Sequence, residues 1–344
     1  MRFSIFFFSS NDALGEGERY RLVLDAARLG DECGFHAVWT PERHFHNFGG
    51  IFPSPAVLSA ALATATSRIQ LRAGSVVLPL HHPASVAEAW SVVDNLSGGR
   101  VGLAFASGYS PTDFLLAPDS YADRNRLLDE KVDVVRRLWR GESVAFSDGK
   151  QDRVEIRLHP PPVQRELPVW ITCGGASVDK FAATGALGVN VLTALFVQTV
   201  SDLQQRIAAY RRARVEAGHG GNGQVTLMLH TYLDESVEAA RAKVQKPFTE
   251  YLRSSVEVWA KGFKRLEEVP PHRREDMLAF AFERYFRTSA LFGSARSSIP
   301  FVEQLAHSGV DEIACLVDFG LEPQAVMASL RRVIELRDRL HSEP

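Results

Sequence analysis

The sequence predicts a single α/β domain built as a (β/α)8 barrel, also called a TIM barrel. Apolar runs rich in valine, leucine and isoleucine alternate along the chain with segments of helical spacing, which is typical of parallel strands buried on both faces. Eight such runs can be assigned, and each is followed by a helical segment. Because barrels of this kind often exceed 300 residues, we expect residues 1–344 to form one domain.

The first third of the chain contains the first four predicted strands. We expect strands at 2–8 and 35–39, and two more within the βαβ unit that runs from Ile69 to Phe114. The helix between the first two strands carries a regular apolar stripe, and the next helix has Pro55 near its start, where a missing N–H does no harm. A charged amphipathic helix is expected at 121–140, after the fourth strand.

The second half contains two interruptions. Two short alternating runs within 141–167 predict a hairpin inserted after the fourth helix, because Gly and Pro residues bound them. Residues 236–292 predict a helical insertion after the seventh strand, broken at Pro247 and at Pro270–Pro271, whose aromatic side chains would pack it onto the barrel. The remaining elements are strands at 168–172, 189–195, 225–232 and 312–317, with helices at 177–185, 200–217 and 323–340.

The composition argues against several classes of partner. The formal net charge is −2 and the pI is about 6.6, so the chain lacks the basic surplus that binds nucleic acid. Its three cysteines are far apart in the sequence, which predicts free thiols and a cytoplasmic location. The apolar run near residue 3 is too short for a signal peptide, and we expect no contact with a membrane.

Small residues end several predicted strands, at the face where barrel enzymes place their chemistry. Gly74–Ser75 and Ala106–Gly108 leave space for a flat ligand against the backbone, although such residues can also serve close helix packing. Gly174–Ser177 joins a strand to a helix. Free N–H groups there would bind an anion, and the alternative is an ordinary turn with Ser177 as the N-cap.

The loop after the second strand holds our candidate catalytic residue, His44. An imidazole titrates near neutral pH and can act as an acid or a base, and Arg43 beside it would add a fixed charge. A single loop histidine is more often a surface residue. His44 and His46 also match a metal-ligand pair, which only His230 and Asp318 could complete, so we assign no metal site.

Several strings in these positions resemble the bacterial luciferase-like flavin monooxygenases. They are Thr40–Phe45, Leu78–Pro83 and Ser97–Arg100, and the likeness extends over essentially the whole chain. The strings Glu42–His46 and Val310–Leu316 are most similar to luciferase-like proteins of natural-product assembly lines.

The resemblance implies where a flavin would bind. It places the FMN phosphate at Gly174–Ser177 and the isoalloxazine ring against Gly74–Ser75, where the family has a cis peptide bond. The cofactor-binding residues implied are Gly74, Ser75, Ala106, Ser107, Gly108, Tyr109, Gly174, Gly175, Ala176 and Ser177. Two departures stand out: Ala106 replaces a reactive cysteine of bacterial luciferase, and Ser107 replaces an arginine that helps to hold the phosphate.

A further departure concerns the catalytic pair. The histidine usually given the catalytic role in the family aligns with Arg43, and His44 aligns with the second histidine. Either His44 is therefore the base, or Arg43 serves as a fixed charge near the flavin or an anionic substrate. An apolar substrate pocket is expected from Phe6, Phe8, Phe45, His46 and Phe48.

The activity implied is that of a two-component monooxygenase, which takes FMNH2 from a separate flavin reductase and inserts one atom of O2 into an organic substrate. The substrate would be a small molecule of secondary metabolism or an acyl or aminoacyl group on a carrier protein, and hydroxylation and Baeyer–Villiger insertion are both compatible. A homodimer is also implied, and the resemblance implies that the helical insertion at 236–292 is a lid-like segment over the flavin. The alternatives are a deazaflavin-dependent oxidoreductase on the same fold, a metal-dependent barrel hydrolase and a flavin-binding protein without turnover.

Overall fold

The structure is a computed structural model that describes the whole chain except residues 9–19, 47–50, 176, 197, 261–270 and 343–344. Within the described residues, eight parallel strands close a ring in the order β9-β11-β1-β2-β3-β4-β7-β8, with β8 pairing back to β9. The ring confirms the predicted (β/α)8 barrel. Its strands are β1 (Arg2–Phe6), β2 (Ala37–Thr40), β3 (Gln70–Val77), β4 (Val101–Ala106), β7 (Val169–Cys173), β8 (Asn190–Ala194), β9 (Val225–Asp234) and β11 (Glu312–Leu316).

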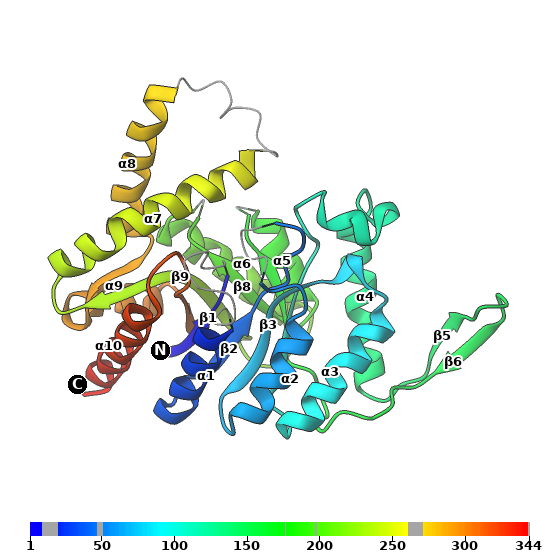
Figure 1. The fold of residues 1–344 in the computed structure, drawn as a ribbon. Coiled ribbons are helices and arrows are strands. Elements are labelled where there is room, and N and C mark those ends of the chain that lie inside the picture. The colour runs from blue at the N-terminus through cyan, green and yellow to red at the C-terminus, as the bar shows by residue number, and fades with distance from the viewer. Residues whose placement is uncertain (9–19, 47–50, 176, 197, 261–270, 343–344) are drawn as a thin grey trace.

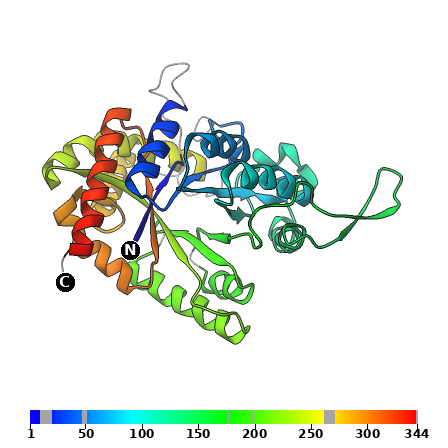
Figure 2. The same ribbon diagram turned by 90° about the horizontal axis from the view of Figure 1, so that it is seen from below.

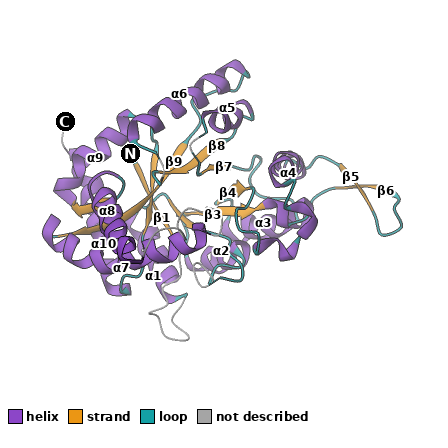
Figure 3. Cartoon of the chain, turned by 90° about the horizontal axis from the view of Figure 1, so that it is seen from above, coloured by secondary structure: helices purple, strands orange, loops and turns teal. Residues whose placement is uncertain are grey.

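Helices surround the strands on the outside, as Figure 3 shows from above. Their ends follow from local sequence: Ser54 accepts a hydrogen bond from the N–H of Val57 at the start of α2, and Thr199 and Asp202 form a capping box on α6. The helices are α1 (Arg21–Cys33), α2 (Pro55–Ala65), α3 (Pro83–Ser97), α4 (Arg124–Trp139), α5 (Val178–Ala186), α6 (Val200–Glu216), α7 (Val237–Ala260), α8 (Pro271–Thr288), α9 (Ala295–His307) and α10 (Pro323–Ser342).

The inside of the barrel is filled with side chains. Arg72 on β3 forms a buried ion pair of 2.8 Å with Glu312 on β11, and its guanidinium packs over the rings of Trp39 and Trp170. Phe6 stacks on Trp39 above this layer, with ring centroids 5.8 Å apart. A packed interior leaves the ends of the strands as the place where a ligand can bind.

An antiparallel hairpin projects from the barrel after α4, where the alternating runs predict one (Figures 1 and 2). It consists of β5 (Val144–Ser147) and β6 (Arg153–Ile156), which pair with each other alone among the described strands. The hairpin is bounded on its far side by the proline-rich segment 160–162.

The segment after β9 differs from its prediction in two ways. Pro247 lies inside α7 and does not break it, because Val244 and Phe248 on either side are fully buried and hold the helix in place. Residues 291–294 are not helical but form β10 (Leu291–Ser294), which pairs in parallel with the last four residues of β9. The last residues of β9 extend beyond the barrel, and β10 pairs with their N–H and C=O groups. In Figure 1, α7 and α8 lie on the same side of the molecule as β9.

Candidate functional site

The barrel brings the predicted site residues to the carboxyl ends of its strands. Arg43 and His44 follow β2, Gly74–Ser75 lies in β3, Ala106–Tyr109 ends β4, and Gly174–Gly175 follows β7. Two of the predicted residues, Phe48 and Ala176, lie outside the described residues. We call the surface formed by these strand ends the barrel mouth.

The peptide bond between Gly74 and Ser75 is cis, as the family resemblance implies. The register between β3 and β4 shifts at this point, and the Ser75 hydroxyl hydrogen-bonds the hydroxyl of Thr172 on β7. The space beside Gly74 is not empty, however. The rings of Phe6 and Trp39 occupy the position that a Cβ would take, so on that side glycine makes room for the protein's own aromatic layer.

Three glycines near the mouth differ in what surrounds them. A Cβ on Gly108 would meet Phe114 and Val77 at 2.8 Å, so this glycine too is needed for packing. Gly174 and Gly175 have nothing within 4 Å of the corresponding position. Only at this last pair among the predicted glycines does the backbone face open space.

The open glycines lead directly into helix α5. Ser177 is its N-cap and accepts a hydrogen bond from the N–H of Lys180 at 3.4 Å. The free N–H groups of the first turn and the positive end of the helix dipole favour an anion at such a terminus. The residues present therefore fit a phosphate group at this turn, as expected for FMN.

Glu42 is the best-connected residue of the site, and the sequence interpretation gave it no role. Its Oε2 accepts a hydrogen bond from the N–H of Val77 at 2.7 Å, and its Oε1 lies 2.9 Å from His44 Nε2. Burial opposes its ionisation, but the hydrogen bonds from His44 and His81 outweigh burial and hold the pKa of Glu42 below its usual value. The signal available in the sequence was a carboxylate directly after a buried strand and two residues before the candidate base.

His44 is held against this carboxylate. Its side chain is 10% exposed, and the hydrogen bond to Glu42 raises its pKa above the ordinary value of 6.5, although burial opposes the rise. With Nε2–H bonded to Glu42, the other ring nitrogen is the one available to a ligand. Asp113, at the start of the 3-10 helix η2 (Asp113–Leu116), faces His44, and burial raises its pKa. His44 can therefore act as an acid or a base at the mouth.

Arg43 lies between two aromatic rings. Its guanidinium carbon is 4.4 Å from the centre of the Phe8 ring and 5.1 Å from that of Tyr109, and Nη1 donates a 2.9 Å hydrogen bond to the Tyr109 hydroxyl. Its Nε is buried and bonds no described residue. The backbone N–H of Phe8 donates to both oxygens of Asp318, which anchors the main chain at this residue. A guanidinium stays protonated, so Arg43 provides a charge and not a base.

The remaining predicted pocket residues occupy three different positions. Phe8 lies at the mouth, Phe6 is fully buried below it, and Phe45 is 61% exposed and points outward with a φ of 56°. His46 is also exposed. The structure therefore does not gather these side chains into one apolar pocket. The positive φ of Phe45 is uncommon for a residue other than glycine.

His230 lies apart from the histidines of the loop. It is buried in the middle of β9 (Val225–Asp234), in contact with aromatic side chains of α7 and α8, and burial lowers its pKa to about 3. Among the described residues, no group of three His, Cys, Asp or Glu side chains is placed to hold a metal ion. Nor does any described helix combine the length and apolar character needed to cross a bilayer.

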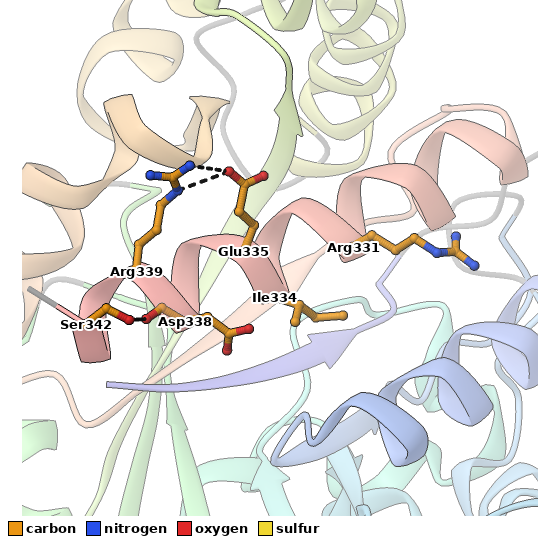
Figure 4. Close-up of a pocket in the computed structure, with 6 residues that line it drawn as sticks. All are labelled: Arg331, Ile334, Glu335, Asp338, Arg339 and Ser342. Atoms are coloured by element: carbon orange, nitrogen blue, oxygen red, sulfur yellow. Dashed lines mark hydrogen bonds and ion pairs between the residues drawn. The ribbon is translucent and has the colours of Figure 1, made fainter.

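Two cavities were found on the described part of the molecule, and one of them is lined by residues of the candidate site. The larger, of 540 Å³, lies on the outer face of α10, and the side chains that line it all come from that one helix (Figure 4). Arg339 there forms an ion pair with Glu335 at 2.8 Å. A smaller cavity of 160 Å³ is lined in part by Glu42 and His81.

A family model described as luciferase-like monooxygenase matches residues 1–312. The chain belongs to the luciferase-like monooxygenase family. This membership confirms the resemblance drawn from the motifs of residues 40–45, 78–83 and 97–100, and with it the class of flavin-dependent monooxygenase.

Individual members of the family resemble the chain to different extents. The oxygenase component of flavin-dependent trigonelline monooxygenase from Acinetobacter baylyi is 26% identical over 97% of this chain and 94% of its own length. The 4-hydroxyprotoasukamycin monooxygenase of Streptomyces nodosus subsp. asukaensis is 36% identical over 40% of this chain and 37% of its own. The crystal structure of monooxygenase RslO1 from Streptomyces bottropensis superimposes with a TM-score of 0.82 at 25% identity, covering 97% of this chain and 98% of that one. Other matches include F420-dependent enzymes.

Proposed function

We propose that this luciferase-like monooxygenase is the oxygenase component of a two-component system that uses FMNH2 and O2. The observation that carries the proposal is the open glycine turn at Gly174–Gly175, which leads into the N-terminus of α5 at the same mouth as His44 and Arg43. When bound, reduced FMN would supply the two electrons that convert one oxygen atom to water while the other enters the substrate.

The side chains of the mouth take separate roles in this proposal. The backbone of Gly174–Gly175 and the first turn of α5 bind the phosphate, and the cis peptide at Gly74–Ser75 lies where the ring would rest. His44 moves a proton at its free ring nitrogen, and its hydrogen bond to Glu42 raises its pKa above the ordinary value. Arg43 holds a positive charge beside the aromatic rings of Phe8 and Tyr109.

Separate reduction of the flavin is supported by the trigonelline relative, which is named as an oxygenase component and aligns over nearly the whole chain. We propose that a flavin reductase supplies FMNH2 to this chain as well, and that the oxygenase is a homodimer. A substrate from secondary metabolism is supported by the 4-hydroxyprotoasukamycin relative and by the strings at 42–46 and 310–316. It would enter either free or as an acyl or aminoacyl group on a carrier protein.

Product analysis under ¹⁸O2 tests the proposal. The protein is supplied with FMN, NADH, an unrelated flavin reductase and catalase, together with candidate substrates in free and carrier-bound form. We expect one ¹⁸O atom per product molecule and no product when the reductase is left out. Product formed with reduced F420 in the absence of oxygen would instead support the deazaflavin-dependent alternative, which the F420-dependent relatives favour. Failure to form product with every substrate and both cofactors would contradict the proposal.

A further inference from the structure

His230 has no role in the proposed chemistry, yet its side chain faces the inside of the barrel at the level of the mouth. It pairs in register with Leu316 on β11, which pairs in turn with Phe6 on β1. Leu316, Phe6 and Met228 all belong to the cluster that fills the barrel. Because residues two apart on a strand point to the same face, the side chain of His230 points inward like that of Met228.

Aromatic rings surround this imidazole. Five described rings have their centroids 4.8 to 6.1 Å from that of the imidazole, and they belong to Phe196, Phe248, Tyr251, Tyr285 and Phe319. We call these rings together with the imidazole the His230 cage. Nε2 of His230 is buried and bonds no described residue, and burial lowers the pKa of His230 to about 3. The cage therefore contains a neutral imidazole with an unpaired ring nitrogen.

The cage is less tightly closed on the side of Phe196 and Tyr285. Both side chains are half-buried, and their ring centroids lie 5.9 and 6.1 Å from that of the imidazole, compared with 4.8 Å for the fully buried Phe248. On this side an exposed hydrogen bond of 3.4 Å joins Arg284 Nη2 on α8 to the backbone carbonyl of Phe196. A ligand that enters here would displace a surface contact and leave the buried packing of α7 in place.

The cage adjoins the mouth. The ring of Phe196 lies 6.4 Å from that of Phe8, on which the Arg43 guanidinium packs, and the charges of Arg43 and Asp318 act on Tyr251. In the order of strands, β1 and β2 separate the cage strands β9 and β11 from β3, which carries the proposed seat of the flavin ring. The cage is therefore placed beside the flavin, where a substrate would lie.

The groups in the cage fit an aromatic ring that carries a hydroxyl group. Aromatic side chains bind planar rings by stacked and edge-on contacts. A neutral imidazole donates or accepts at Nε2 according to its tautomer, and a hydroxyl group can do either, so the two match in both tautomers. Two phenols, Tyr251 and Tyr285, are part of the cage, and burial raises the pKa of both, that of Tyr285 to about 12. The cage thus accepts a neutral phenol and disfavours an anion.

We propose that the His230 cage binds the substrate of this oxygenase, that the substrate is a hydroxylated aromatic compound, and that Nε2 of His230 bonds its hydroxyl group. This inference rests on the proposed function, because it names the substrate class of that oxygenase. Entry of the substrate ring moves Phe196 and Tyr285 apart and gives the imidazole a partner. An aromatic ring without a polar group would leave the buried nitrogen unpaired and would bind less tightly.

The test compares 2-naphthol with naphthalene, which has the same rings and no hydroxyl group. In calorimetric titrations with and without oxidised FMN, we expect 2-naphthol to bind at least about tenfold more tightly. In NMR of protein with ¹⁵N-labelled histidine, 2-naphthol alone should shift the Nε2 resonance of His230. His230→Phe should abolish the difference in affinity, and His230→Gln, which keeps a polar group, should restore part of it. The matched control, His307→Phe on the exposed end of α9, should keep the full difference.

The outcomes separate this inference from the proposed function. Equal affinity of the wild type for the two compounds, or an unchanged preference in His230→Phe, would overturn the role of the cage. The preference for 2-naphthol without any oxygenase activity would support the cage and contradict only the proposed function. If His230→Phe forms ¹⁸O-labelled product from a non-aromatic substrate at the wild-type rate, the proposed function stands and the cage is not its substrate site.

Discussion

Phe6 lies directly beneath Gly74: a Cβ atom added to Gly74 would be 2.5 Å from Cζ of the Phe6 ring. The ring cannot move aside, because it is fully buried and stacks on Trp39, which in turn packs against Trp170 and Arg72. The floor of the mouth is therefore set by the packed interior of the barrel. Because Phe6 on β1 and Trp39 on β2 fill the space next to Gly74, only a residue without a side chain fits at this position of β3.

Gly74→Ala should destabilise the fold. Forcing a methyl group into a filled core typically costs about 1–3 kcal/mol, and the stacked rings leave no room for adjustment. Urea unfolding would measure the change in the free energy of unfolding. The control is Gly149→Ala in the hairpin loop, where nothing lies within 4 Å of the new atom. If both variants unfold alike, Phe6 does not fix this position.

Gly175→Val should behave in the opposite way. Its side chain would enter open space, so the free energy of unfolding should change by less than about 0.5 kcal/mol. The same side chain would block the turn before α5, and the affinity for FMN should fall by about tenfold or more. Fluorescence titration with FMN measures this loss, with Gly220→Val, another open glycine, as the control. Unaltered affinity in Gly175→Val would place the phosphate elsewhere.

The ionisation of His44 should make stability depend on pH. Its pKa is raised in the folded state by Glu42, so the extra stability is fully present below the unfolded value of 6.5 and is lost as the pH rises through the higher folded pKa. The free energy of unfolding of the wild type, relative to His44→Gln, should therefore fall as the pH rises above the ordinary histidine pKa of 6.5. Unfolding in urea over a series of pH values would show it. A difference that grows with pH would contradict the assignment of the Glu42–His44 bond.

Arg43→Lys should not be a conservative change. Lysine keeps the charge but loses the planar contact with the rings of Phe8 and Tyr109, which we expect to cost about 1 kcal/mol of stability. Arg126→Lys serves as the control, because Arg126 is exposed and its ion pairs lie on the surface of α4. Chemical denaturation measures the free energy of unfolding of both variants. An equal decrease in the two would mean that the contact of Arg43 with the rings does not stabilise the fold.

The sequence was sufficient to predict the barrel, because the periodicity of apolar residues in each strand and helix can be read from neighbouring positions. The alternating runs at 144–146 and 154–158 predicted a hairpin, and the hairpin is present. The helical spacing of 236–292 did not reveal β10, since four residues pair there only because β9 extends past the ring. The effect of Pro247 was also mispredicted, because burial of its neighbours is a tertiary property.

The site was predicted less completely than the fold. The sequence was enough to place Arg43, His44 and the glycine turn at the barrel mouth, because their positions depend only on where each strand stops. The role of Glu42 depends on contacts with Val77 and His81, 35 and 39 positions away, which follow from the pairing of β2 with β3. The filling of the space at Gly74 by Phe6 is another long-range contact that no local pattern encodes.

The binding of flavins to the turn before α5 tests the central claim most directly. The affinity of the protein for reduced FMN is compared under anaerobic conditions with its affinity for reduced riboflavin, which has the same ring but no phosphate. Because the open glycines and the N-terminus of α5 are proposed to bind the phosphate, FMN should bind at least about tenfold more tightly, a difference of about 1.4 kcal/mol. Equal affinity for the two flavins, or no binding of either, would contradict the account.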